Sequence, residues 1–210
     1  AHGFARRYSW DVIGAETLAD GATRLQLSLK QSDITLKIWP HAFELVLDVT
    51  VGKTLCVALT MRNTGDTSYT CTSALHTYFD IGDITKASVD GLNGVSYINT
   101  VGGNRSNHTQ EGTITFDQEV DRIYTDTDHT CTIKAPARKR LIEVAKTGSK
   151  TTVVWNPWID KSKRMPDFGD DEYPYMVCVE TANAANETLT IPPGGSHTTT
   201  AILSVQEDAT

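Results

Sequence analysis

Apolar and polar residues alternate along three segments in the first third of the chain. Residues 23–30, 43–49 and 55–61 place large apolar side chains at every second position, with mostly polar or small residues between them. A period of two is that of a β-strand with one buried face. The dipeptides Asp20-Gly21 and Gly52-Lys53, both typical of turns, stand at the boundaries of these segments. The pattern predicts consecutive antiparallel strands.

Further strands are expected along the rest of the chain, at 113–116, 130–135, 141–146, 152–155, 176–181 and 197–205. Turn signals recur near the spacing of roughly 8–12 residues that is typical of sandwiches and barrels. No stretch keeps a helical period over three turns, and no repeat or linker divides the chain. We therefore expect an all-β, antiparallel β-sandwich that forms a single domain over residues 1–210.

The segment 155–174 differs from the strand-like text around it. It contains three prolines, Trp158, a basic cluster and an acidic cluster; the clusters are Lys161, Lys163 and Arg164, and Asp167, Asp170, Asp171 and Glu172. A long connection inside a compact domain usually serves function. A solvated surface excursion is the alternative, and the aromatic content makes it weaker.

Composition narrows the possible partners. Apolar residues make up 39% and charged residues 21% of the 210 residues, which is an ordinary globular balance, and the formal net charge is -7. A nucleic-acid surface needs a clustered basic excess, so no nucleic-acid partner is expected. No apolar run is long enough to cross a bilayer, so no membrane partner is expected either. The oligomeric state stays open.

Several chemical signatures are absent. The four cysteines lack C-x-x-C spacing and the six histidines do not pair at metal-ligand spacing, so no metal is expected. Reduced, buried thiols fit these cysteines, and a reducing, cytoplasmic location follows. Gly52-Lys53-Thr54 resembles a phosphate loop, but Leu47 occupies the place of its leading glycine. Neither G-x-S-x-G nor H-E-x-x-H occurs.

Two ionisable residues stand inside apolar strand-like text. His76 lies within residues 73–79, and Glu180 ends the apolar run 175–180. A buried carboxylate without a partner is costly, and its pKa rises unless something compensates, as a general base near neutral pH requires. From the residues alone, a buried structural hydrogen bond is the commoner explanation of each. The pair does not by itself identify a reaction.

Five segments in a fixed order carry a resemblance to a known family. They are residues 2–6 (His-Gly-Phe-Ala-Arg, with Trp10 beyond), 74–79 (Ala-Leu-His-Thr-Tyr-Phe), 154–157 (Val-Trp-Asn-Pro), 167–173 (Asp-Phe-Gly-Asp-Asp-Glu-Tyr) and 177–180 (Val-Cys-Val-Glu). Together they span nearly the whole chain. The sequence resembles the glucose-6-phosphate 1-epimerase branch of the aldose 1-epimerase superfamily.

This resemblance implies a galactose mutarotase-like β-supersandwich with its site on the concave face of a large sheet. It implies an isomerase that interconverts the anomers of a hexose 6-phosphate without a cofactor, because only protons move. His76 matches the histidine that protonates the ring oxygen, and Glu180 the carboxylate that deprotonates the anomeric hydroxyl. His2 matches a sugar-binding histidine, Arg6 an arginine associated with the phosphate, and Asp121 a sugar-binding acid.

Alternatives remain at several of these positions. Arg7 is the second choice for the phosphate, Asp121 is equally well explained as a rim carboxylate, and Trp155 and Trp158 suit packing better than sugar stacking. A substrate without phosphate, a non-catalytic carbohydrate-binding module and a two-carboxylate glycosidase are the rival functions. The family has a further N-terminal portion, with another phosphate-associated arginine, so the chain is expected to be N-terminally truncated.

Overall fold

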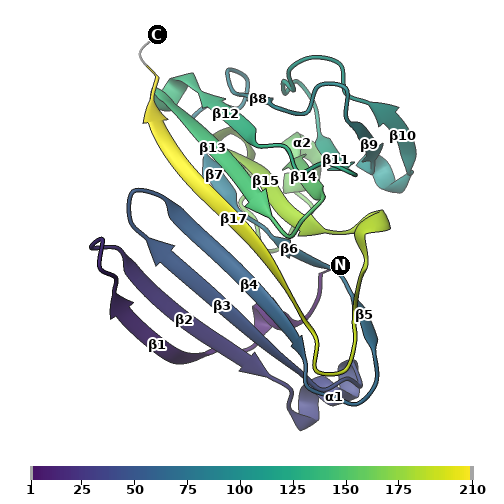
Figure 1. Cartoon of the computed structure of the whole chain (residues 1–210). Coiled ribbons are helices and arrows are strands. Elements are labelled where there is room, and N and C mark those ends of the chain that lie inside the picture. Colours follow the sequence, from purple (N-terminus) through teal and green to yellow (C-terminus); the bar gives the residue numbers. More distant parts are fainter. Residues whose placement is uncertain (1, 209–210) are drawn as a thin grey trace.

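The computed structural model describes residues 2–208, and within them the chain forms two large antiparallel β-sheets (Figure 1). The first sheet has the strand order β1-β2-β3-β4-β17-β13-β12-β8. The second follows the path β10-β9-β11-β14-β15-β6, with β7 also paired to β15, and β5 and β16 form a small third sheet. The expected all-β antiparallel sandwich is confirmed.

The strands of the first sheet are β1 (Asp11–Thr17), β2 (Thr23–Lys30), β3 (Phe43–Val51), β4 (Leu55–Asn63), β8 (Ser88–Asp90), β12 (Cys131–Ala135), β13 (Arg140–Thr147) and β17 (Ser196–Glu207). Those of the second are β6 (Ser73–Leu75), β7 (Tyr78–Asp80), β9 (Ser96–Asn99), β10 (Ser106–Thr109), β11 (Val120–Tyr124), β14 (Thr151–Asn156) and β15 (Met176–Asn183). The remaining elements are β5 (Tyr69–Cys71), β16 (Leu189–Ile191), α1 (Asp33–Ile38) and α2 (Trp158–Ser162), with short 3-10 turns at Ala5–Arg7, Val101–Gly103, Pro136–Arg138, Tyr173–Tyr175 and Ala185–Glu187. No helix within 2–208 has the length and apolar character needed to span a membrane.

The main core lies between the second sheet and strands β12, β13 and β17 of the first. Ile133 and Ile142 pack in it together with Val154, Val177 and Val179, all of them almost fully buried. Successive residues of a strand point to opposite faces of its sheet. Because Val177 and Val179 of β15 face this core, the residues between and beyond them face away from it.

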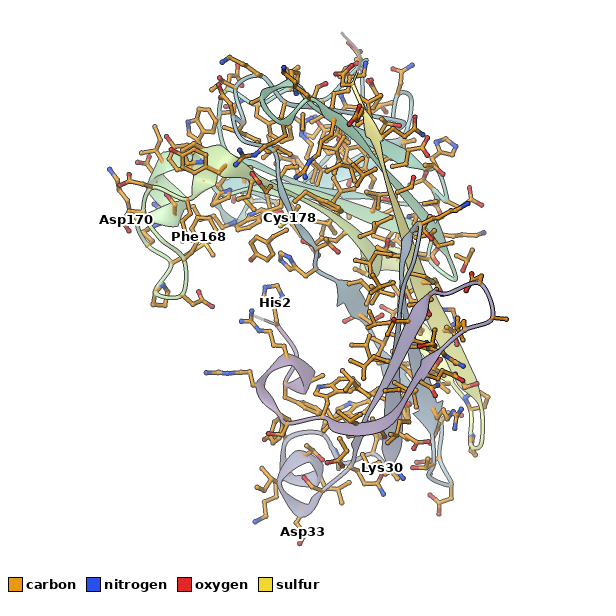
Figure 2. All side chains as sticks on the ribbon, turned by 90° about the vertical axis from the view of Figure 1, so that its left-hand side faces the viewer. His2, Lys30, Asp33, Phe168, Asp170 and Cys178 are labelled. Carbon is orange, nitrogen blue, oxygen red and sulfur yellow. The ribbon has the colours of Figure 1, made fainter. Side chains whose placement is uncertain are left out.

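A second core covers one face of strands β2–β4. Leu29, Phe43 and Met61 are buried there, and Phe4 and Trp39 pack against them from the N-terminal segment and from the end of α1. Figure 2 shows that segment and α1 on the same side of the sheet, with His2 directed toward the second sheet. The second core therefore holds the N-terminal segment next to the face of the second sheet that is turned away from the main core.

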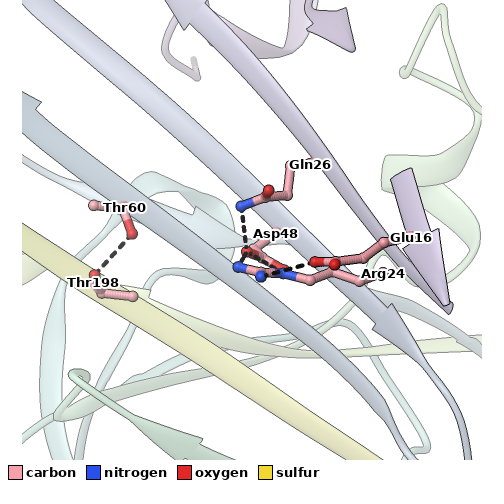
Figure 3. Close-up of polar contacts among 6 residues, drawn as sticks. All are labelled: Glu16, Arg24, Gln26, Asp48, Thr60 and Thr198. Atoms are coloured by element: carbon pink, nitrogen blue, oxygen red, sulfur yellow. Dashed lines mark hydrogen bonds and ion pairs between the residues drawn. The ribbon is translucent and has the colours of Figure 1, made fainter. Parts of the chain in front are cut away.

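The opposite face of the same strands is polar. Arg24 on β2 forms ion pairs with Asp48 on β3 and Glu16 on β1, and Gln26 donates to Asp48 at 3.0 Å (Figure 3). The hydroxyls of Thr60 and Thr198 lie 2.8 Å apart across β4 and β17. One polar and one apolar face explain the strict alternation that predicts these strands.

One expected strand is wrong. Residues 113–116 form a single bridge, in which Ile114 pairs with Val89 of β8, and no strand. The hydroxyl of Thr113 also bonds to Asp90. Strand β8 has only three residues and its other edge already pairs with β12. Few backbone groups of β8 are therefore available to pair with residues 113–116. The other expected strands are present, with ends that differ by at most two residues.

Candidate functional site

The strand register places four side chains in one row on the face of the second sheet opposite the main core. The paired residues are Asp121 with Trp155, Trp155 with Cys178, and Cys178 with Tyr78, on β11, β14, β15 and β7. Directly paired residues share a face of the sheet. Glu180 lies two residues beyond Cys178 on β15, so it points to the same face. This face therefore collects an acid, two aromatic rings, a thiol and a buried carboxylate.

A break between β6 and β7 brings a histidine to Glu180. β6 ends at Leu75 and β7 begins at Tyr78, and both strands pair with β15. Between them the amide of Thr77 donates to the carbonyl of Leu75 at 3.1 Å, which closes a three-residue turn centred on His76. Nε2 of His76 lies 3.2 Å from Oε1 of Glu180, and its ring stacks on Tyr78 with centroids 4.9 Å apart.

Burial shifts the pKa values of Glu180 and His76 in opposite directions. Glu180 is only 6% exposed, and this burial, followed by the charge of Asp121, raises the pKa of Glu180 to about 8. Burial and the neighbouring His2 hold the pKa of His76 below its usual value. Near neutral pH the two groups therefore share one proton, which rests on the carboxyl and can transfer to Nε2.

The N-terminal segment adds the other two predicted basic residues. The ring of His2 meets that of His76 edge-on with centroids 5.6 Å apart. Arg6 lies in the 3-10 turn Ala5–Arg7, and its charge contributes to lowering the pKa of both histidines, after burial in each case. Nη2 of Arg6 also lies 4.0 Å from Oδ2 of Asp167. The structure thus brings His2, Arg6, His76 and Glu180 to one place.

Asp121 belongs to the same face through the strand register and carries a partner that the sequence did not indicate. Nζ of Lys161, on α2, lies 3.0 Å from Oδ2 of Asp121 and 3.1 Å from Oε1 of Glu119. It also lies 5.7 Å from the centre of the Trp155 ring. In the sequence Lys161 is one of three basic residues in a loop, and nothing there separates it from the other two.

A buried asparagine fixes the base of the loop that carries Lys161. Asn156 is fully buried, and its side-chain amide donates to the carbonyls of Tyr173 at 2.9 Å and Met176 at 2.8 Å. Its Oδ1 accepts from the amide of Trp158, whose φ of 56° is unusual for a bulky residue. Trp158 packs against Tyr173 with centroids 5.4 Å apart, as expected for a packing residue. These bonds hold the start of the loop, at Asn156, against its end, at Tyr173 and Met176.

Three side chains here also offer donors of the kinds that bind metal ions. Ligand atoms of His76, Cys178 and Glu180 all lie within 4.8 Å of one another. Zinc binds the thiolate rather than the thiol. Cys178 is fully buried, and burial followed by the charge of Glu180 raises the pKa of its thiol strongly. This environment opposes the thiolate, so we assign no metal to these residues.

The cost of burying Glu180 predicts that Glu180→Gln stabilises the protein at alkaline pH. The folded-state pKa of about 8 lies above the unfolded value of 4.5, so the unfolded chain releases its proton first and stability falls as pH rises through this interval. A glutamine does not titrate and keeps a hydrogen bond available to His76. We expect the free energy of unfolding of Glu180→Gln, relative to that of the unmodified protein, to increase by roughly 2 kcal/mol or more between pH 5 and 8.5. Urea denaturation of the two proteins measures this difference. Equal pH dependence in the two proteins would contradict the raised pKa.

Solved structures place the chain in a class of folds. A structure from Salmonella typhimurium, described provisionally as a mutarotase, superposes with a TM-score of 0.87 at 30% identity and covers 99% of this chain and 68% of that one. A galactose mutarotase-like protein from Clostridium acetobutylicum superposes with a TM-score of 0.77 at 13% identity, over 98% of this chain and 69% of that one. The molecule is a galactose mutarotase-like β-sandwich.

Sequence comparisons identify the family within that class. The family model for aldose 1-epimerase matches residues 1–204. Proteins from Escherichia coli (strain K12) and Cenchrus ciliaris, both provisionally named glucose-6-phosphate 1-epimerase, are 40% identical over 185 residues and 36% identical over 201 residues. These matches cover 88% and 92% of this chain but 61% of each relative, so the chain spans about three fifths of their length. The chain belongs to the aldose 1-epimerase family.

Proposed function

We propose that the protein interconverts the α and β anomers of a hexose 6-phosphate by acid–base opening and closing of the sugar ring. The observation that carries this proposal is the 3.2 Å contact between Nε2 of His76 and Oε1 of Glu180. Asp121 shares the sheet face with Glu180, and His2 of the N-terminal segment contacts the ring of His76. The names of the bacterial and plant relatives support glucose 6-phosphate as the sugar.

The shared proton of the pair fits the chemistry. Ring opening needs a base at the anomeric hydroxyl and an acid at the ring oxygen at the same time. When the proton of Glu180 moves to His76, the carboxylate becomes that base and the imidazolium that acid. The same single proton therefore prepares both groups.

Protons and electron pairs balance in each step of the reaction. The carboxylate of Glu180 takes the proton of the anomeric hydroxyl, and the freed electron pair forms the carbonyl at C1. The bond from C1 to the ring oxygen breaks, and that oxygen takes the proton of His76. Rotation about the C1–C2 bond presents the other face of the aldehyde, and closure with reversed roles gives the other anomer. Ring opening leaves the proton on Glu180 and a neutral His76, and closure returns the protein to the carboxylate and imidazolium with which it began.

This scheme predicts a bell-shaped dependence of kcat/KM on pH. Activity falls at high pH as the pair loses its proton, near the pKa of about 8 that burial gives Glu180. It falls at low pH when a second proton binds, below the usual range of histidine because the pKa of His76 is lowered. The measurement is NMR magnetisation transfer between the anomers after subtraction of the buffer rate. A rate that increases steadily from pH 5 to 10 would contradict the scheme.

Arg6 is proposed to bind the 6-phosphate, and substrate comparison tests it. Arg6→Ala is expected to raise KM for glucose 6-phosphate roughly tenfold, the loss of one charge-assisted contact, and to leave KM for glucose unchanged. Arg7→Ala, at the exposed neighbour that is the second choice for the phosphate, decides between the two arginines, and we expect it to leave both KM values unchanged. An unphosphorylated aldose is the second candidate, because Asp167 lies 4.0 Å from Arg6 and competes with a phosphate. Equal KM for the two sugars would favour it.

A further inference from the structure

Lys161 stands where it can control the orientation of Asp121. It bonds to one oxygen only, Oδ2, and its second ion pair, to Glu119, keeps the ammonium group from swinging away. The Trp155 ring lies beneath it. Burial lowers the pKa of Lys161, but the bonds to Asp121 and Glu119 outweigh this and leave it raised, so the side chain is charged throughout the working pH range.

The second oxygen of Asp121 remains available. Among residues 2–208, Oδ1 of Asp121 receives no hydrogen bond. Its side chain is 21% exposed, on the face of the sheet that carries Cys178 and Glu180. A carboxylate with one oxygen fixed by a lysine presents the other in a defined direction, which is what recognition of a sugar hydroxyl requires.

We propose that Lys161 is a positioning residue, which directs the free oxygen of Asp121 toward the sugar and balances the Asp121 charge that faces His76 and Glu180. This inference rests on the proposed function. It gives the basic cluster of the 155–174 segment a specific role, carried by one lysine out of the three basic residues.

The charge argument follows from the groups around the pair. The ionisable side chains that face Glu180 come from the turn after β6, from β7, from β11 and from β15 itself; they are His76, Tyr78, Asp121 and Cys178. The N-terminal segment adds His2 and Arg6, which act on His76 and lower its pKa. Of these, Asp121 is the acid whose charge raises the pKa of Glu180, after burial, and it is also the smallest of the influences on His76, whose pKa it raises against the lowering by burial. The positive charge of Lys161, 3.0 Å from Asp121, partly offsets the negative charge that Asp121 directs at the pair. Lys161 therefore lowers the pH at which the pair releases its shared proton.

The test compares Lys161→Met with Lys163→Met. Methionine keeps the aliphatic stem beside Trp155 and removes the ammonium group with its charge and its bonds to Asp121 and Glu119. Lys163 is an exposed lysine of the same segment. We expect Lys161→Met to raise KM roughly tenfold with a smaller change in kcat, and to move the alkaline limb of the pH profile upward by about half a unit or more. Lys161→Arg is expected to restore the profile, and Lys163→Met to leave KM and profile unchanged.

A second readout separates this inference from the proposed function. Titration of the Glu180 carboxyl by carbon-13 NMR needs no sugar, with Glu180→Gln assigning the signal. An upward shift of the Glu180 pKa in Lys161→Met supports the inference whether or not the protein accelerates anomer exchange. Absence of such acceleration in the unmodified protein would remove the proposed function alone. An unchanged Glu180 titration and an unchanged KM in a folded, active Lys161→Met protein would overturn the inference and leave the proposed function intact.

Discussion

Glu180→Gln is expected to slow anomer exchange of glucose 6-phosphate by roughly 10²–10⁴-fold while the fold is kept. The amide has nearly the shape of the carboxylate, but it cannot take the proton of the anomeric hydroxyl. The same substitution is expected to stabilise the protein at alkaline pH, so lost activity would not reflect unfolding. Such opposite effects on activity and stability are typical of a site whose charge is costly to bury.

The control for this variant is Glu111→Gln, which makes the same chemical change at an exposed glutamate. NMR magnetisation transfer measures both exchange rates at equal protein concentration. Substrate binding should persist in Glu180→Gln, because the residues proposed to contact the sugar hydroxyls and phosphate are unchanged. Near-normal exchange in this variant would remove Glu180 as the base.

His76→Asn is the second large effect we expect, again roughly 10²–10⁴-fold. The variant loses Nε2, the atom that contacts Glu180 at 3.2 Å and that is proposed to protonate the ring oxygen. Because the two residues share one proton, their losses should not multiply. The double variant His76→Asn with Glu180→Gln should be about as slow as the slower single variant.

His129→Asn is the matched control, because His129 is an exposed histidine that bonds to the carbonyl of Gly91, away from the pair. The exchange rates of the two single variants and the double variant come from the same NMR assay. Losses that multiply in the double variant would show that His76 and Glu180 act independently. That outcome would contradict the shared proton, though not the role of either residue alone.

The fold was predictable wherever one face of a strand meets a core and the other meets solvent. Strand β2 alternates because Leu29 faces the second core while Arg24 lies in the polar network on the opposite face. Strands β6, β7 and β8 have three residues each, too few to show a period. The helix α1, with six residues, ends before a helical period can appear; a capping box between Ser32 and Thr35 starts it.

The site was predictable only in part. A carboxylate at the end of an apolar strand marks Glu180 from the residues alone, and the structure places it among buried groups with a raised pKa. The positions of Lys161 and Tyr78 depend on strand register and on the path of a loop, which join residues far apart in the chain. No local pattern carries that information. The role proposed for His76 rests on resemblance; the structure shows that its Nε2 lies 3.2 Å from Oε1 of Glu180, a contact that the sequence does not indicate.

Exchange between the two anomers of glucose 6-phosphate, followed by NMR with the unmodified protein, tests the central claim most directly. The account predicts an exchange rate that exceeds the buffer rate, increases in proportion to protein concentration and leaves the sugar otherwise unchanged. Saturable binding of the sugar with an exchange rate equal to that of buffer alone would contradict it, because that is the behaviour of a carbohydrate-binding module.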